Sequence, residues 1–136
     1  MTATRGGGLL VLLLAAATAS CDGNGPSLPC ACTEEFRFFH LTVVDGNGAP
    51  ADGVEVSVVR GSTGERLEYG QPSGLAPGDY LVMDDSYSDR IGADEAFAVS
   101  GVRGAESFTT EFRFGTDACR CHVTLLAGPE RVTLSP

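Results

Sequence analysis

Residues Leu41 to Val58 read LTVVDGNGAPADGVEVSV, and this stretch decides the fold more than any other. Its two ends alternate in side-chain direction within β-branched runs, which is the pattern of half-buried strands. Between them, Asp45 to Gly53 contains three glycines and Pro50, which favour turns and stop a regular strand. This loop is too long for a two-residue hairpin turn, so the two strands need not be direct neighbours.

The pattern D-x-x-G-x-P-x-x-G-V-x-V in this stretch resembles the carboxypeptidase regulatory-like domains and, more widely, the transthyretin-like β-sandwich. Gly78 to Val82 adds to the resemblance, because it has the G-x-Y-x-V strand of the same family. The resemblance implies an all-β, seven- to eight-stranded transthyretin-like or Ig-like sandwich over residues 30–136. It says little about function, because one fold serves many functions.

Further alternating runs support an all-β fold with turns every 8–12 residues. No segment has a helical period with capping signals, beyond at most one short helical turn. The elements expected on these grounds are a long first strand with a bulge near Phe38 (Glu35–Val44), a short edge strand (Glu65–Tyr69), a helical turn (Gly92–Glu95) and two alternating strands (Ser107–Gly115 and Cys119–Ala127).

The N-terminus has the pattern of a secretory signal, with Arg5, an uncharged apolar stretch and small residues before Cys21. The apolar run is too short to span a bilayer comfortably. Thr18 to Cys21 (TASC) resembles a bacterial lipobox, with Thr18 where that motif prefers leucine. We therefore expect a lipoprotein signal peptide over residues 1–20, a diacylglycerol and an N-acyl chain such as palmitate on Cys21, and a flexible tether over residues 21–29.

Five cysteines are an odd number for an exported protein, and lipidation of Cys21 leaves four, in two C-x-C pairs. In an oxidising compartment the default for these four is disulfides. Residues i and i+2 of a strand lie side by side, so pairing within a C-x-C is strained. The open alternatives are Cys30–Cys119 with Cys32–Cys121, if the two segments run parallel, or the crossed set if they run antiparallel.

A metal site is the main alternative for these residues. Its ligands for copper(I) or zinc would be Cys30, Cys32, Cys119, Cys121 and His122. Strand alternation places His122 on the exposed face, opposite the neighbouring cysteines, and the C-x-x-C spacing of zinc knuckles is missing. We therefore favour disulfides and expect no cofactor and no metal.

A resemblance to hydroxyisourate hydrolases, which share the transthyretin-like fold, raises the question of catalysis. Residues 121–126 (CHVTLL) resemble their Y-H-V-P-L-L, which matches His122 to their second catalytic histidine. Thr42 stands where their first histidine belongs, and their terminal Y-R-G-S is missing here. A degenerate or altered hydrolase with a displaced His40 and His122 pair is one alternative, but we expect no enzymatic activity.

The chain is acidic, with a formal net charge of −9 and no lysine. Such a chain repels nucleic acid and anionic headgroups. The sequence therefore predicts an exported, lipid-anchored interaction or structural module at the bacterial cell envelope, on the outer membrane or the cell surface. Its expected partners are the membrane, through lipidated Cys21, and an envelope protein or glycan, with no nucleic acid.

Overall fold

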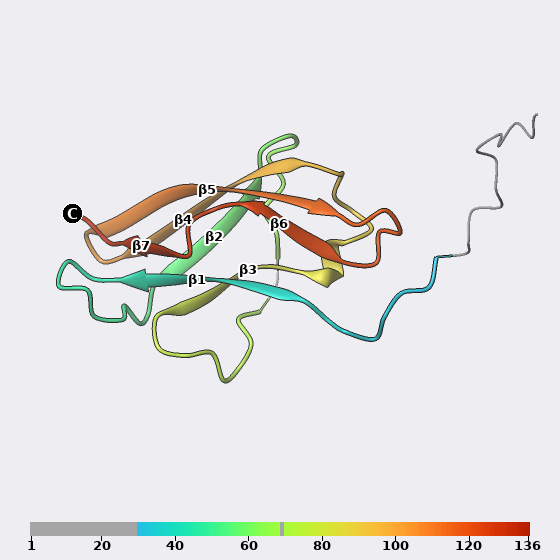
Figure 1. Cartoon of the computed structure of the whole chain (residues 1–136). Coiled ribbons are helices and arrows are strands. Elements are labelled where there is room, and N and C mark those ends of the chain that lie inside the picture. The colour runs from blue at the N-terminus through green and yellow to red at the C-terminus, as the bar shows by residue number, and fades with distance from the viewer. Residues whose placement is uncertain (1–29, 69) are drawn as a thin grey trace, which may run out of the picture.

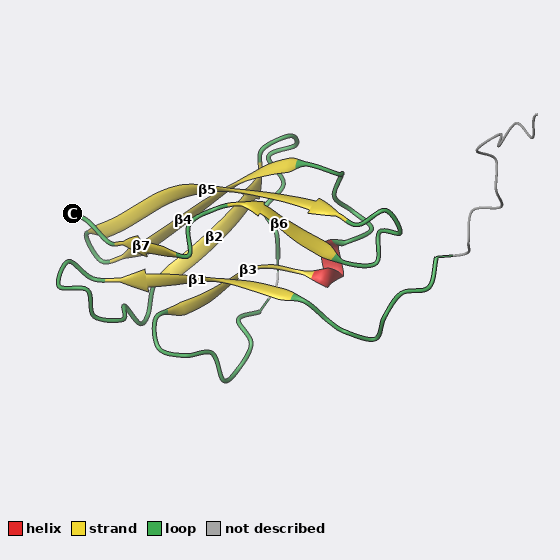
Figure 2. Cartoon of the chain, in the orientation of Figure 1, coloured by secondary structure: helices red, strands yellow, loops and turns green. Residues whose placement is uncertain are grey.

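Residues 30–68 and 70–136 are described by the computed structural model, and they form two β-sheets with no α-helix (Figure 1, Figure 2). The expected signal peptide, Cys21 and the tether lie outside these residues. The strands are β1 (Phe38–Val44), β2 (Glu55–Arg60), β3 (Asp79–Asp84), β4 (Glu95–Arg103), β5 (Glu106–Thr116), β6 (Val123–Ala127) and β7 (Arg131–Thr133), and a 3₁₀ turn, η1 (Asp85–Tyr87), follows β3. In this described part, no helix is long and apolar enough to cross a membrane.

The strands divide into a three-stranded sheet, in the order β3-β1-β7, and a four-stranded sheet, in the order β2-β4-β5-β6. β1 runs antiparallel to β3 and parallel to β7, and every pair in the larger sheet is antiparallel. β1 and β2 therefore lie in different sheets, and the loop between them crosses from one sheet to the other. This crossing is why the loop needs more residues than a hairpin turn.

The core lies between the two sheets and follows from the alternation of their strands. Leu41 and Val43 of β1 and Val82 of β3 are fully buried, as are Phe97 and Val99 of β4 and Phe112 and Phe114 of β5. The ring centroids of Phe39 and Phe114 are 5.4 Å apart, which joins the sheets across the core. The inward side of β1 is thus apolar, and its other side, with Phe38 and His40, faces away from the core.

The motif Gly78-Asp79-Tyr80 fixes the long loop to the three-stranded sheet. The Gly78 amide donates to the Asp52 side chain at 2.9 Å, and its positive φ of 79° suits glycine, since a Cβ there would lie 2.8 Å from the Val43 carbonyl oxygen. The Tyr80 hydroxyl donates to the Ala51 carbonyl at 2.7 Å and accepts from the Val54 amide at 2.9 Å. The two motifs that carry the family resemblance, the long loop after β1 and the G-x-Y-x-V strand, are thus hydrogen-bonded to each other.

Several expected elements differ from the structure. The first strand begins at Phe38 instead of Glu35, and its register shift lies between Phe39 and His40. Glu65–Tyr69 does not form a named strand in the described residues, although an isolated bridge pairs Arg66 with Val59. The helical turn forms at η1, where the Asp84 side chain caps it by accepting from the Ser86 amide, and not at Gly92–Glu95.

Candidate functional site

One end of the molecule is closed by two disulfides. Cys30 bonds to Cys119 and Cys32 bonds to Cys121, with Cα atoms 5.5 and 5.4 Å apart. They join the segment before β1, residues 30–37, which we call the arm, to residues 117–122 between β5 and β6, which we call the cysteine loop. This pairing is the set expected for segments that run parallel. Disulfides of this kind belong to an oxidising, exported environment.

The cysteines do not lie in strands, contrary to the alternation that placed them on β-faces. The cysteine loop turns between the strands, with Arg120 at a positive φ of 56°, and β6 begins only at Val123. The Asp117 side chain holds this turn by accepting from the Cys121 amide at 2.8 Å. Because the turn breaks the two-residue period, the side-chain direction of His122 cannot be counted from its neighbours.

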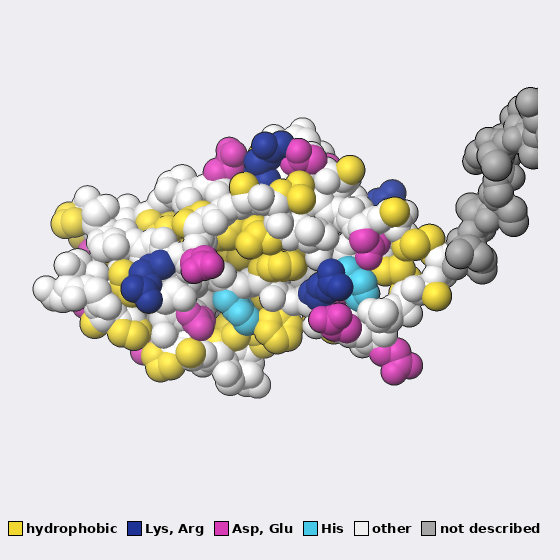
Figure 3. Space-filling view, viewed as in Figure 1, with side chains coloured by type: hydrophobic (Ala, Val, Ile, Leu, Met, Phe, Trp, Pro, Cys, Tyr) yellow, Lys and Arg dark blue, Asp and Glu magenta, His cyan; other side chains and the backbone are white. Residues whose placement is uncertain are grey.

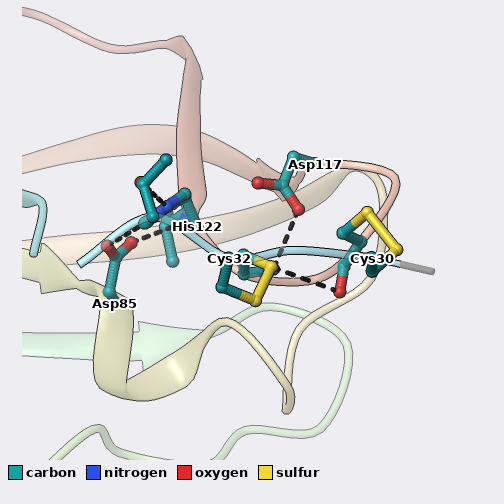
Figure 4. Close-up of a disulfide and its surroundings, with 9 residues drawn as sticks. Cys30, Cys32, Asp85, Asp117 and His122 are labelled. Carbon is teal, nitrogen blue, oxygen red and sulfur yellow. Dashed lines mark hydrogen bonds and ion pairs between the residues drawn. A yellow bond between two sulfur atoms is a disulfide. The ribbon is translucent and has the colours of Figure 1, made fainter. Parts of the chain in front are cut away.

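His122 is buried, with 6% of its surface exposed, so its expected exposure on the face of Arg120 and Thr124 is wrong. Its Nδ1 lies 2.7 Å from Asp85 Oδ2 and its Nε2 lies 2.8 Å from Thr33 Oγ1. Figure 4 shows the Asp85 and His122 side chains directed at each other beside the two disulfides. Thr33, His122 and Asp85 thus form one hydrogen-bonded chain, which we call the relay.

Asp85 is the buried end of the relay, and it also holds the arm to η1. Its carboxylate accepts from the Val123 amide at 2.7 Å and from the Arg37 amide at 2.8 Å, and its own amide donates to the Arg37 carbonyl at 3.0 Å. Burial raises the pKa of Asp85, but the hydrogen bonds from His122 and from the two amides outweigh it, so the pKa lies below its ordinary value.

The ionised Asp85 carboxylate can only accept hydrogen bonds, so it fixes the tautomer of the neutral imidazole. Nδ1 of His122 then carries the proton and donates it to Asp85, and the lone pair of Nε2 faces the Thr33 hydroxyl. A cavity of about 390 Å³ opens at this point. It is lined by Ala31, Cys32, Thr33, Glu35, Arg37, Asp117, Ala118, Cys119, Cys121 and His122.

The cysteines do not supply metal ligands in this state. All four sulfurs are in disulfides, whereas copper(I) and zinc bind thiolates. Across residues 30–68 and 70–136, no group of three or more His, Cys, Asp or Glu side chains is placed to hold a metal ion. His122 is instead engaged on both ring nitrogens by Asp85 and Thr33.

A second hollow lies on the outer side of the β3-β1-β7 sheet, and it shares no lining residue with the cavity beside the relay. Its volume is about 530 Å³, and we call it the β1–β3 groove. It is lined by Phe36, Phe38, His40, Gly70, Pro72, Ser73, Gly74, Leu75, Ala76, Asp79, Leu81 and Asp84. Figure 3 shows hydrophobic side chains beside a histidine in the region of β1. His40 and His122 therefore line different hollows, and the displaced catalytic pair is not formed.

The wall of the groove is the loop before β3, which Gln71 fixes in place. The Leu81 amide donates to the Gln71 side-chain oxygen at 2.7 Å, and the Gln71 side-chain NH₂ donates to the Leu81 carbonyl at 3.3 Å. This amide pair satisfies the edge of β3 as a neighbouring strand would. The groove is therefore open to side chains of a ligand, while the edge beside it is closed to an added strand at Leu81.

Two features of the groove point to a ligand. Phe36 and Phe38 are 57% and 56% exposed, although each is a large aromatic side chain. The Nε2 atom of His40 is buried and has no hydrogen-bond partner among the described residues. Exposed aromatic rings next to an unsatisfied polar atom are typical of a binding surface, because the rings and the atom each carry a free-energy cost in the protein without a ligand.

Comparison with protein-family models, curated proteins and solved structures finds no match for this chain. Its description therefore depends on its own residues: an all-β domain of two packed sheets, stapled at one end, with a relay beside the disulfides and a separate groove on the smaller sheet.

Proposed function

We propose that this protein is an exported, lipid-anchored binding module of the bacterial cell envelope, with a transthyretin-like β-sandwich related to the carboxypeptidase regulatory-like domains. The disulfides support export, and the TASC motif supports lipidation of Cys21. The arm, residues 30–37, and the C-terminus lie at opposite ends of the domain (Figure 1). A tether over residues 21–29 would therefore attach the disulfide-bonded end of the domain to the membrane, and it would hold that end within about 30 Å of the membrane surface when fully extended.

The observation that carries the binding function is the β1–β3 groove with its two exposed phenylalanines. At about 530 Å³ it falls in the range of ligand pockets, roughly 300–1,000 Å³. Among the described residues that line it, none is Lys or Arg, while Asp79 and Asp84 contribute carboxylates. The chain as a whole carries a net charge of −9, which attracts cations to this surface.

These features select a basic, apolar segment of another envelope protein as the ligand. The Phe36 and Phe38 rings offer apolar surface and faces for an arginine or lysine, and Asp79 offers a counter-charge. An acidic ligand would meet like charge on the groove and on the whole domain.

Calorimetric titration with short synthetic peptides tests this proposal. A peptide of alternating arginine and leucine should bind the soluble domain, and its glutamate–leucine counterpart should not. Phe38→Ala should weaken binding by about tenfold or more, as loss of a central aromatic anchor does. Val102→Ala is the matched control, since Val102 is 50% exposed but lies on the other sheet.

Equal binding of both peptides, or equal effects of the two substitutions, would contradict the groove as a site for basic segments. Glycan fragments from the cell wall form a separate arm of the titration. Binding of these fragments, with no binding of the basic peptide, would replace the protein ligand with a glycan.

A further inference from the structure

We propose that Thr33 is a nucleophile activated by His122, and that the relay is an acyl-transfer site for small esters. The site lies apart from the β1–β3 groove and does not depend on it. It rests on three observations: the unbroken hydrogen bonds from Thr33 through His122 to Asp85, the exposure of Thr33 beside a buried base, and the cavity of about 390 Å³ where they meet.

The geometry matches the roles that a hydroxyl nucleophile needs. Thr33 Oγ1 lies 2.8 Å from His122 Nε2, within the reach of a general base for the proton that it removes. Asp85, 2.7 Å from Nδ1, orients the imidazole and faces the positive charge that forms on it. The Asp85 carboxylate is hydrogen-bonded to His122 and to the amides of Val123 and Arg37 and does not line the cavity, so Asp85 is a positioning residue and not a catalytic one.

The disulfides hold this pair in register. Thr33 follows Cys32 and His122 follows Cys121, and these two cysteines are bonded to each other. The bridge therefore fixes the backbone of the nucleophile against that of the base, although 89 residues separate them. Supporting residues that lock a reactive pair in place are what a site needs for a productive geometry.

The chemical step is balanced by the groups present. Thr33 Oγ1 attacks the ester carbonyl carbon, and its proton passes to His122 Nε2. The bond to the alcohol breaks, and the departing alkoxide takes that proton. Water then attacks the acyl-threonine with His122 again as the base, and releases the acid and free Thr33. Glu35 and Asp117 line the cavity beside a single guanidinium, Arg37, so the substrate class is a small ester without negative charge.

A fluorophosphonate probe tests the nucleophile directly. Thr33 Oγ1 should displace fluoride from phosphorus in the disulfide-intact protein, and peptide mass mapping should find the adduct at Thr33. Thr42 is an internal control, since its hydroxyl donates to Asp79 at 2.7 Å and not to a histidine. Thr33→Ser should keep the adduct, while Thr33→Val and His122→Gln should lose it. p-Nitrophenyl acetate hydrolysis should follow the same order.

The Asp85→Asn variant distinguishes a role of Asp85 in positioning His122 for catalysis from a purely structural role. Nitrogen-15 NMR should show the Nδ1-protonated tautomer of His122 in the wild-type protein and a changed tautomer in the variant, with a labelling rate at least 100-fold lower. Two results would overturn the proposal: no adduct at Thr33, or an adduct whose rate His122→Gln leaves unchanged. In either case the relay is only a latch that holds the arm to η1.

Discussion

Replacing Asp85 with alanine tests how much the relay stabilises the stapled end. The carboxylate accepts three hydrogen bonds of 2.7–2.8 Å, from His122 Nδ1 and the amides of Arg37 and Val123. Hydrogen bonds to a charged group contribute about 1.5–3 kcal/mol each, and water can reach part of the freed space. We therefore expect Asp85→Ala to lower the free energy of unfolding by about 4 kcal/mol, which corresponds to a Tm lower by about 15 °C.

Differential scanning calorimetry of the oxidised domain measures this loss, and Asp79→Ala is the control. Asp79 accepts one side-chain hydrogen bond, from Thr42, so its loss should cost about 1 kcal/mol. The reasoning would be refuted if Asp85→Ala destabilised the domain no more than Asp79→Ala does.

The pKa of the Asp85 carboxylate also predicts how the difference in stability between the wild-type protein and Asp85→Asn depends on pH. Because the pKa of Asp85 is lower in the folded protein than its ordinary value of 3.8, its contribution is fully present above that value. It is lost as the pH falls through the folded pKa, when protonation breaks the acceptor role. The gap in Tm between wild type and Asp85→Asn should therefore be constant near pH 6 and shrink below about pH 4. A gap that widens in acid would contradict this assignment.

Three further predictions concern the anchor, the staples and the packing. In a bacterial host, Cys21→Ser should abolish radiolabelled-palmitate incorporation and release the protein from membranes, and unchanged labelling would rule out the lipid anchor. Replacing the cysteines of either disulfide with serine should lower the free energy of unfolding, measured by chemical denaturation, by about 2 kcal/mol, because the other bridge still closes nearly the same long loop. Loss of both disulfides should lower it by more than about 4 kcal/mol. Equal losses for the single and double replacements would contradict the argument that the two bridges close one shared loop. Gly101→Ala should cost about 1–3 kcal/mol, since a Cβ would lie 2.2 Å from the Phe108 ring, whereas Gly46→Ala, with no atom within 4 Å, should change little by the same assay.

The sequence predicts the two-sheet framework well because alternation is a local signal. The runs around Leu41, Val56 and Phe112 each repeat with the period of a half-buried strand, and each forms one. The Gly and Pro content of residues 45–53 likewise indicates a loop, and its length is consistent with a crossing between sheets. The pairing order of the strands depends on contacts far apart in the chain and has no such local signature.

Sequence analysis does not predict the relay, and the reason is physical. Its members come from three distant segments, and 89 residues separate Thr33 from His122. The positive φ of Arg120 ends the alternation just before His122, so counting from the cysteines places the ring on the wrong side. The available signal was the pair of motifs C-x-C-T and C-x-C-H, because Thr33 and His122 each follow a cysteine, and these two cysteines can be bridged to each other.

Chemical-shift mapping by NMR tests the binding function most directly, because it shows where a ligand lies on the domain. The arginine–leucine peptide is titrated into the labelled, oxidised protein. The proposed function predicts that the amides of residues 36–40 and 70–81 shift together in proportion to occupancy, and that those of β6 do not. Shifts confined to β6, or none at all at saturating peptide, would contradict the β1–β3 groove as the binding site.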